Sequence, residues 1–232
     1  MVSEKVSISV DDGFFDAYVS LPPQGDGPGL LLIQEIFGVN QHMRDVADRL
    51  AAEGFIVMVP DLFWRMKRNL ELGYEGADFD KALEYFQQFD EKQGLADLKE
   101  AASALRDHKK CTGRVGTIGF CLGGKLAFRL ASQYNMNAAV SYYPVFLDKH
   151  LEEAERLRCE TIIHFAALDH FVPLETYETI KEGLKHKQNI HIYLYEGVDH
   201  GFNCDARSAY NKEAADLAWS RSLEVFNKEL KG

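Results

Sequence analysis

The sequence predicts an α/β protein, a three-layer sandwich in which helices cover both faces of a mostly parallel central sheet, preceded by a β-hairpin. Short segments that are apolar throughout, at residues 29–34 and 55–59, are typical of strands buried on both faces. Amphipathic helical patterns separate such segments, as a parallel sheet requires. The chain has 232 residues, 46% of them hydrophobic, which suffices for one core without disulfides. We therefore expect one domain spanning residues 1–232.

The elements follow in order. Residues 6–10 and 14–21 flank a turn in which Gly13 supplies a positive φ, which predicts the hairpin. We expect Asn40 to cap a helix that runs to Glu53, where Gly54 ends it in the left-handed conformation. The polar residues 74–80 predict a loop before helices over 81–89 and 95–108. The remaining predicted strands are 114–120, 138–143, 161–168 and 190–195, and the remaining helices are 123–134, 174–186 and a C-terminal one with the stripe Trp219, Leu223, Phe226 and Leu230.

Charge and apolar runs exclude several classes of protein. Lys and Arg number 26 against 36 Asp and Glu, and a net charge of −10 disfavours nucleic acid and anionic membranes as partners. No apolar run approaches the roughly 18 residues that span a bilayer. The N-terminus has no apolar signal core, and the 4 scattered cysteines indicate free thiols. We expect a cytoplasmic protein, monomeric or a small homo-oligomer.

One turn carries a candidate nucleophile. Cys121 lies between a predicted strand and a predicted helix in the sequence Gly119-Phe-Cys-Leu-Gly-Gly124. Glycines two residues before and two residues after a nucleophile allow the strained turn that lifts it above a sheet. Two alternatives remain open: glycine-rich turns also bind phosphate, and a cysteine in a tight turn can simply be buried. The turn therefore predicts a nucleophile only together with its partners.

Two further turns supply those partners. Asp169 follows the strand predicted at 161–168, and His200 follows the strand at 190–195. Taken singly, the aspartate is typical of a helix cap and the histidine of an ordinary loop. Because the carboxyl ends of parallel strands meet at one edge of a sheet, the order nucleophile, acid, histidine predicts a catalytic triad.

Four motifs together resemble the dienelactone hydrolase family over nearly the whole chain: Gln34-Glu-Ile-Phe-Gly38, Gly119-Phe-Cys-Leu-Gly-Gly124, Asp169-His-Phe-Val-Pro173 and His200-Gly-Phe202. The resemblance implies an α/β-hydrolase fold, Cys121 as nucleophile, His200 as its base and Asp169 as the group that orients the histidine. It also implies a small ester or lactone substrate, a thioester intermediate, and no cofactor or metal.

The same resemblance bears on the groups around the thiol. We expect the backbone N–H groups of Leu122 and Ile36 to form the oxyanion hole. In the family, a glutamate matching Glu35 contacts the resting thiol, and we hypothesise that Glu35 keeps Cys121 protonated until substrate arrives. The alternative for Glu35 is a helix cap or a surface acid.

The substrate pocket departs from the family. In proteins of the family, two arginines hold the carboxylate of dienelactone. When this sequence is aligned to the family without gaps, Phe79 and Cys204 occupy the positions of those arginines. Arg207 is a candidate substitute, and the substrate is expected to be more neutral or bulkier than dienelactone. Simple core packing is the alternative for the aromatic candidates. The candidate pocket residues are Phe37, Trp64, Phe79, Tyr142, Tyr143, Phe202 and Arg207.

Other chemistries remain as alternatives. A metal hydrolase is suggested by acids and histidines near one predicted sheet edge, although their spacing matches no usual zinc motif. These residues are His164, Asp169, His170, Asp199 and His200. A thiol redox sensor or a catalytically silent binding protein on the same fold is the third possibility, with Cys204 as a conceivable partner of Cys121.

Overall fold

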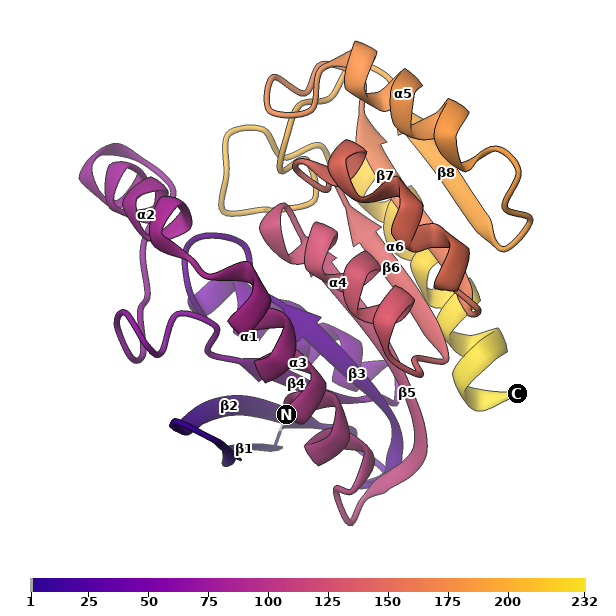
Figure 1. Ribbon diagram of the computed structural model, residues 1–232. Coiled ribbons are helices and arrows are strands. Elements are labelled where there is room, and N and C mark those ends of the chain that lie inside the picture. The colour runs from indigo at the N-terminus through magenta and orange to yellow at the C-terminus, as the bar shows by residue number, and fades with distance from the viewer. Residues whose placement is uncertain (1) are drawn as a thin grey trace. The chain divides into compact units, whose positions relative to one another are not determined.

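The computed structural model describes residues 2–232, and the chain divides after Gly116 into two units that each carry strands and helices (Figure 1). The organisation as one domain stays a prediction. Within residues 2–232, no helix combines the length and the hydropathy needed to cross a membrane.

The first unit opens with the predicted hairpin. Strands β1 (Val2–Val10) and β2 (Gly13–Leu21) pair antiparallel, with Val10 opposite Gly13 at the turn. Strand β2 also pairs antiparallel with β4 (Ile56–Pro60), and β4 pairs parallel with β3 (Gly27–Ile33). Both β3 and β4 are buried along their whole length, as expected for strands covered on both faces. The hairpin and both apolar strands are confirmed.

Helix α1 begins where its predicted cap places it. The side chain of Asn40 accepts the N–H of Met43 at 3.2 Å and starts α1 (Gln41–Ala52), and Gly54 has a φ of +96° just after the helix. Helix α1 packs on β2 and β4, and α3 (Glu91–Arg106) packs on β1, β3 and β4.

The loop predicted at 74–80 is partly wrong, because α2 (Gly76–Gln88) begins inside it. Glycine suggested a break, but Gly76 stands in the first turn of the helix with a φ of +56°. The carboxylate of Asp78 accepts the N–H of Gly73 at 2.7 Å, which folds the preceding loop back onto the helix start. An acid in the first turn also favours the helix dipole.

The second unit contains the three layers in full. Parallel strands β6 (Ala138–Tyr142), β7 (Glu160–Ala166) and β8 (Ile190–Tyr195) follow the last residues of β5 (Cys111–Phe120). Figure 1 shows α4 (Leu122–Gln133), the 3₁₀ segment η1 (Leu147–Arg156) and α5 (Leu174–Leu184) in a row on one side of these strands. Helix α6 (Lys212–Phe226) covers the other side, before the short π-helix η2 (Asn227–Lys231).

One detail of this unit differs from the predictions, and another lies outside them. No element was predicted over the residues of η1, which forms a kinked run that contacts α4 and α5. In α6 the buried side chains include Ala214, Ala218, Ser222 and Phe226, while Trp219 and Leu223 of the predicted stripe are half-buried. Small residues therefore bring α6 close to the sheet, and a serine hydroxyl is buried beneath it.

Candidate active site

The turn that carries Cys121 is strained. Cys121 has φ 57° and ψ −116°, a left-handed value of φ that a residue with a Cβ atom adopts only at a cost. A Cβ atom on Gly119 would lie 2.0 Å from the carbonyl oxygen of Gly123, and one on Gly124 would lie 2.5 Å from that of Tyr142. The turn therefore needs glycine at Gly119 and Gly124, because any side chain there would push β5, α4 and β6 apart.

Backbone hydrogen bonds, and not the thiol, fix the main chain at Cys121. Its N–H donates to the carbonyl of Tyr142 at 3.0 Å, and its carbonyl accepts the N–H of Lys125 at 3.2 Å. Cys121 is the N-cap of α4, but the thiol makes no capping hydrogen bond, and the residue is half-buried. Leu122 is the first residue of the helix, where N–H groups have no intrahelical acceptor. Such an N–H group can stabilise a negative oxygen.

The two carboxylate oxygens of Asp169 have different hydrogen-bond partners. Oδ1 accepts the N–H groups of Phe171 at 2.8 Å and Val172 at 2.9 Å, which fixes the side chain on its own turn. Oδ2 lies 2.8 Å from Nδ1 of His200, and both side chains are buried. The second oxygen is therefore positioned to orient the imidazole and to accept its Nδ1–H.

The imidazole of His200 is enclosed by aromatic rings. Its centroid lies 4.7 Å from the ring of Tyr143 and 4.9 Å from the ring of Phe171, and the residue is 2% exposed. Nε2 is buried and makes no hydrogen bond with any group of residues 2–232. With Nδ1 occupied by Asp169, Nε2 is the nitrogen that can exchange a proton with a reacting group.

A thiolate at Cys121 favours a protonated His200. Burial by itself lowers the pKa of His200, but the negative charge of a Cys121 thiolate and the hydrogen bond to Asp169 outweigh burial and raise it to about 10. A positive imidazolium therefore accompanies the sulfur when the thiol ionises. This is the electrostatic arrangement that an activated cysteine requires.

A buried polar network that the sequence does not predict lies beside the turn of Cys121. The hydroxyl of Ser222 lies 2.8 Å from that of Tyr142 and 3.1 Å from Nε2 of His164. Nδ1 of His164 lies 2.9 Å from the hydroxyl of Tyr195. Burial, together with the nearby charge of Arg221, lowers the pKa of His164 to about 3. His164 is thus a neutral hydrogen-bonding residue of the core.

The candidate pocket residues of the second unit fall into two groups. Tyr142, Tyr143 and Phe202 are fully buried, with ring centroids between 5.7 and 6.4 Å apart. Arg207 is half-buried, and its guanidinium packs on Gly201, where an added Cβ atom would lie 2.7 Å from a guanidinium nitrogen. A cation is therefore held against the residue that follows His200.

The other candidates lie in the first unit. Glu35 and Ile36 follow β3 and are 2% and 6% exposed. The ring of Phe37 lies 6.1 Å from that of Phe79, and both belong to a cluster with Tyr74. The indole N–H of Trp64 donates to Asp97 at 2.9 Å. The functions of these residues stay predictions.

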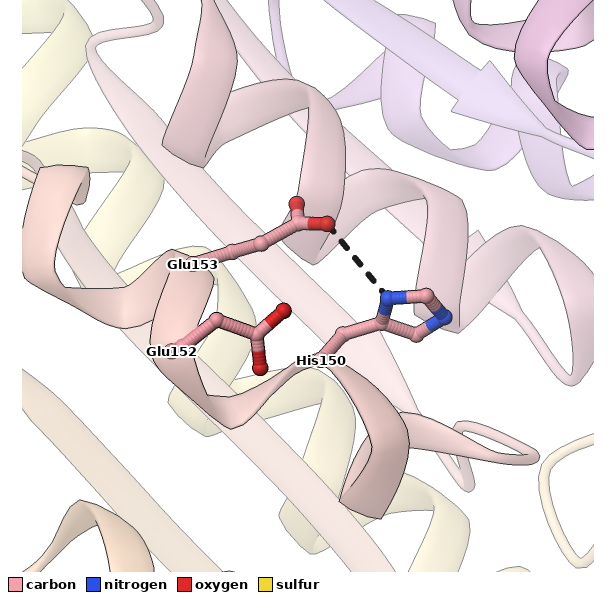
Figure 2. Close-up of side chains that lie close together, drawn as sticks. All are labelled: His150, Glu152 and Glu153. Atoms are coloured by element: carbon pink, nitrogen blue, oxygen red, sulfur yellow. Dashed lines mark ion pairs between the residues drawn. The ribbon is translucent and has the colours of Figure 1, made fainter.

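A cluster of acidic residues and a histidine lies on η1, away from the residues considered in the sequence as candidate metal ligands. The group that lies close enough to share an ion, among residues 2–232, is His150, Glu152 and Glu153 on η1 (Figure 2). Glu153 accepts hydrogen bonds from Arg129, Ser132 and Gln133 of α4, and the pKa of its carboxyl is lowered although burial opposes this. Its oxygens are already used to join η1 to α4, so the cluster is a structural ion-pair network.

Comparison with solved structures defines the class of protein. A crystal structure of a candidate dienelactone hydrolase from Klebsiella pneumoniae matches 98% of this chain and 98% of its own, with a TM-score of 0.87 and 29% identity. The sheet with its covering helices is therefore that of the α/β-hydrolase fold.

The sequence comparisons identify the family. The model of the dienelactone hydrolase family matches residues 15–230. The carboxymethylenebutenolidase of Pseudomonas putida is 34% identical over 226 residues, which are 97% of this chain and 96% of that protein. Carboxymethylenebutenolidase 1 of Cupriavidus pinatubonensis is 31% identical over 227 residues, 97% of each chain. The chain belongs to the dienelactone hydrolase family, and it is a hydrolase of the lactone and ester class.

Proposed function

We propose that this protein hydrolyses small carboxylic esters or lactones with Cys121 as nucleophile, His200 as general base and Asp169 as the orienting acid. The observation that carries the proposal is the buried 2.8 Å contact between Asp169 and His200, in the same unit as a cysteine at a strained strand-to-helix turn. The raised pKa of His200 supports it, because a base that gains a proton when the thiol loses one stabilises the attacking sulfur.

The first half of the proposed reaction is acylation. Nε2 of His200 takes the thiol proton, and the sulfur of Cys121 attacks the acyl carbon. A C–S bond forms, the C–O bond of the ester breaks, and the imidazolium gives its proton to the leaving alkoxide. With a lactone substrate, this alkoxide remains attached to the acyl chain. We propose the N–H groups of Leu122 and Ile36 as donors to the carbonyl oxygen, each worth about 3 kcal/mol in the transition state.

The second half is hydrolysis of the thioester. Nε2 of His200 takes a proton from water, and the hydroxide attacks the acyl carbon. The C–S bond then breaks, and the leaving thiolate recovers the proton from the imidazolium. One water molecule is consumed, and the carboxylic acid is released.

For the substrate we propose a small molecule more neutral or bulkier than dienelactone. Phe79 and Cys204 stand where the family resemblance places anion-binding arginines. We propose Arg207 as the remaining contact for a substrate carboxylate, since its guanidinium packs beside His200 on Gly201. Arg207→Ala should then raise KM for an unsaturated lactone bearing a carboxylate and leave KM for neutral p-nitrophenyl acetate unchanged. Equal effects on both substrates would rule out this contact.

The decisive experiment removes the sulfur. Cys121→Ala should abolish turnover of p-nitrophenyl acetate, and mass spectrometry of the acid-quenched wild-type reaction should show an acetyl group on Cys121. The matched control is Cys111→Ala at the start of β5, which should retain full activity. Turnover by Cys121→Ala would refute the proposal. A wild-type protein without esterase activity, but with an oxidised Cys121–Cys204 bond, would support the redox alternative instead.

Location and assembly are separate proposals. We propose a cytoplasmic protein, because none of the cysteines within the described chain forms a disulfide. We also retain the single domain and the monomer or small homo-oligomer as proposals, which light scattering coupled to size-exclusion chromatography would test.

A further inference from the structure

A second histidine–carboxylate pair lies beside the buried pair of Asp169 and His200. His170 follows Asp169 in the chain, and Asp199 precedes His200. Nδ1 of His170 lies 3.0 Å from Oδ1 and 3.2 Å from Oδ2 of Asp199. This outer pair is largely exposed, with side-chain exposures of 61% and 41%. The two pairs thus join the same two turns, one in the core and one at the surface.

The outer pair reaches His200 through the backbone. Oδ1 of Asp199, which contacts His170, also accepts the N–H of His200 at 2.6 Å. One carboxylate oxygen therefore links the turn that carries Asp169 to the peptide group from which the imidazole extends. A change in that link alters the direction in which the imidazole leaves the main chain.

A row of packed aromatic and histidine rings is the second connection between His170 and the imidazole of His200. The ring centroid of His170 lies 4.1 Å from that of Phe171, which lies 4.9 Å from His200, and His200 lies 4.7 Å from Tyr143. Phe171 is 40% exposed, so its ring lies between the buried imidazole and the surface of the protein. Its N–H donates to Oδ1 of Asp169, and its ring is flanked by the two histidines. His170 therefore packs against the residue that confines the imidazole.

Stability alone does not explain this arrangement. An exposed histidine–carboxylate pair contributes little to the stability of the fold. In catalysis, a displacement of about 1 Å in a reacting group costs about 10²-fold in rate. We propose that His170 and Asp199 are positioning residues, which hold the imidazole of His200 at the orientation needed for proton exchange with Cys121. The inference rests on the proposed function, and it adds to the triad two residues that do not touch the substrate.

The test compares variants of His170. His170→Ala should lower kcat for p-nitrophenyl acetate about tenfold with KM close to that of the wild type, since orientation and not binding is lost. The proton NMR resonance of Nδ1–H of His200 should shift or broaden. His170→Asn, whose amide nitrogen replaces Nδ1 as donor to Asp199, should restore most of kcat and the resonance. The matched control is His186→Ala, since His186 forms a similarly exposed pair with Glu155 at 2.8 Å.

Asp199→Ala gives an independent measurement, because it removes the acceptor of the His200 N–H as well as the contact with His170. It should lower kcat at least as much as His170→Ala, with the melting temperature of each variant within a few degrees of the wild type. Wild-type kcat and an unchanged resonance in both variants would overturn the inference, and an inactive Cys121→Ala would leave the proposed function intact. Activity in Cys121→Ala would overturn the proposed function itself.

Discussion

Gly119 and Gly123 meet so closely that a Cβ atom on Gly119 would lie 2.0 Å from the carbonyl oxygen of Gly123. The last residues of β5 and the first turn of α4 are therefore in backbone contact on either side of Cys121. This contact explains how Cys121 keeps a φ of 57°, because neither flank can move away without separating the strand from the helix.

Gly119→Ala should consequently destabilise the fold and abolish esterase activity. The added methyl group would lie well inside van der Waals contact, so the turn must open, and we expect a loss of about 2–4 kcal/mol in urea unfolding. The control is Gly197→Ala in the same unit, where φ is +70° but nothing lies within 4 Å of the added Cβ atom. This variant carries only the left-handed penalty of about 1–2 kcal/mol and should stay active. Equal stability losses in both variants would show that the close contact is unimportant.

Asp169→Asn tests the electrostatic partner of the histidine. The charge and the hydrogen bond of Asp169 both raise the pKa of His200, so their removal should lower that pKa, and the imidazolium should lose its proton at a lower pH than in the wild type. The amide also favours the wrong tautomer, and we expect kcat to fall about 10³–10⁴-fold. NMR titration of His200 measures the shift. Asp216→Asn on the exposed face of α6 is the control, and an unchanged pKa in Asp169→Asn would contradict the assignment.

The turns that carry Cys121, Asp169 and His200 could be located from the sequence because each lies after the carboxyl end of a predicted strand. Strands β5, β7 and β8 end at Phe120, Ala166 and Tyr195, and parallel strands align their carboxyl ends. The network around Ser222 could not be predicted in this way. Its members come from different strands and from α6, and nothing in the local pattern indicates which buried polar groups meet. The start of α2 was missed because glycine at a helix start resembles glycine in a loop.

Glu35 gives a prediction about the resting thiol. If Glu35 keeps Cys121 protonated, alkylation of Cys121 by iodoacetamide should be slow near pH 6 in the wild type and faster in Glu35→Gln, because a negative neighbour disfavours the thiolate. Peptide mapping of the alkylated protein measures the rate at each cysteine. Buried Cys159, whose thiol pKa is raised to about 11, is the internal control and should not react in either protein. A wild-type Cys121 that already reacts at its maximal rate near pH 6 would refute the hypothesis.

His164 allows a prediction about stability in acid. Its imidazole is fully buried between the hydroxyls of Tyr195 and Ser222, and its pKa is lowered from 6.5 to about 3. The unfolded chain therefore binds a proton at this residue below about pH 6.5, whereas the folded chain does not until about pH 3. The contribution of His164 to stability is fully present above pH 6.5 and is lost as the pH falls toward 3. Each pH unit within this window costs up to about 1.4 kcal/mol.

His164→Gln isolates this contribution, because an amide can bond to neighbouring hydroxyls but does not titrate. The variant should be less stable than the wild type at pH 7 by about 1–3 kcal/mol, since the buried network is imperfectly replaced. Between pH 6 and pH 4 it should lose roughly 2–3 kcal/mol less than the wild type, because one titrating group has been removed. Urea unfolding at a series of pH values measures both quantities, with His186→Ala as an exposed control that leaves the acid slope nearly unchanged. Parallel curves for the wild type and His164→Gln would mean that His164 takes up its proton in the folded protein, and the neutral network behind Cys121 would then have to be abandoned.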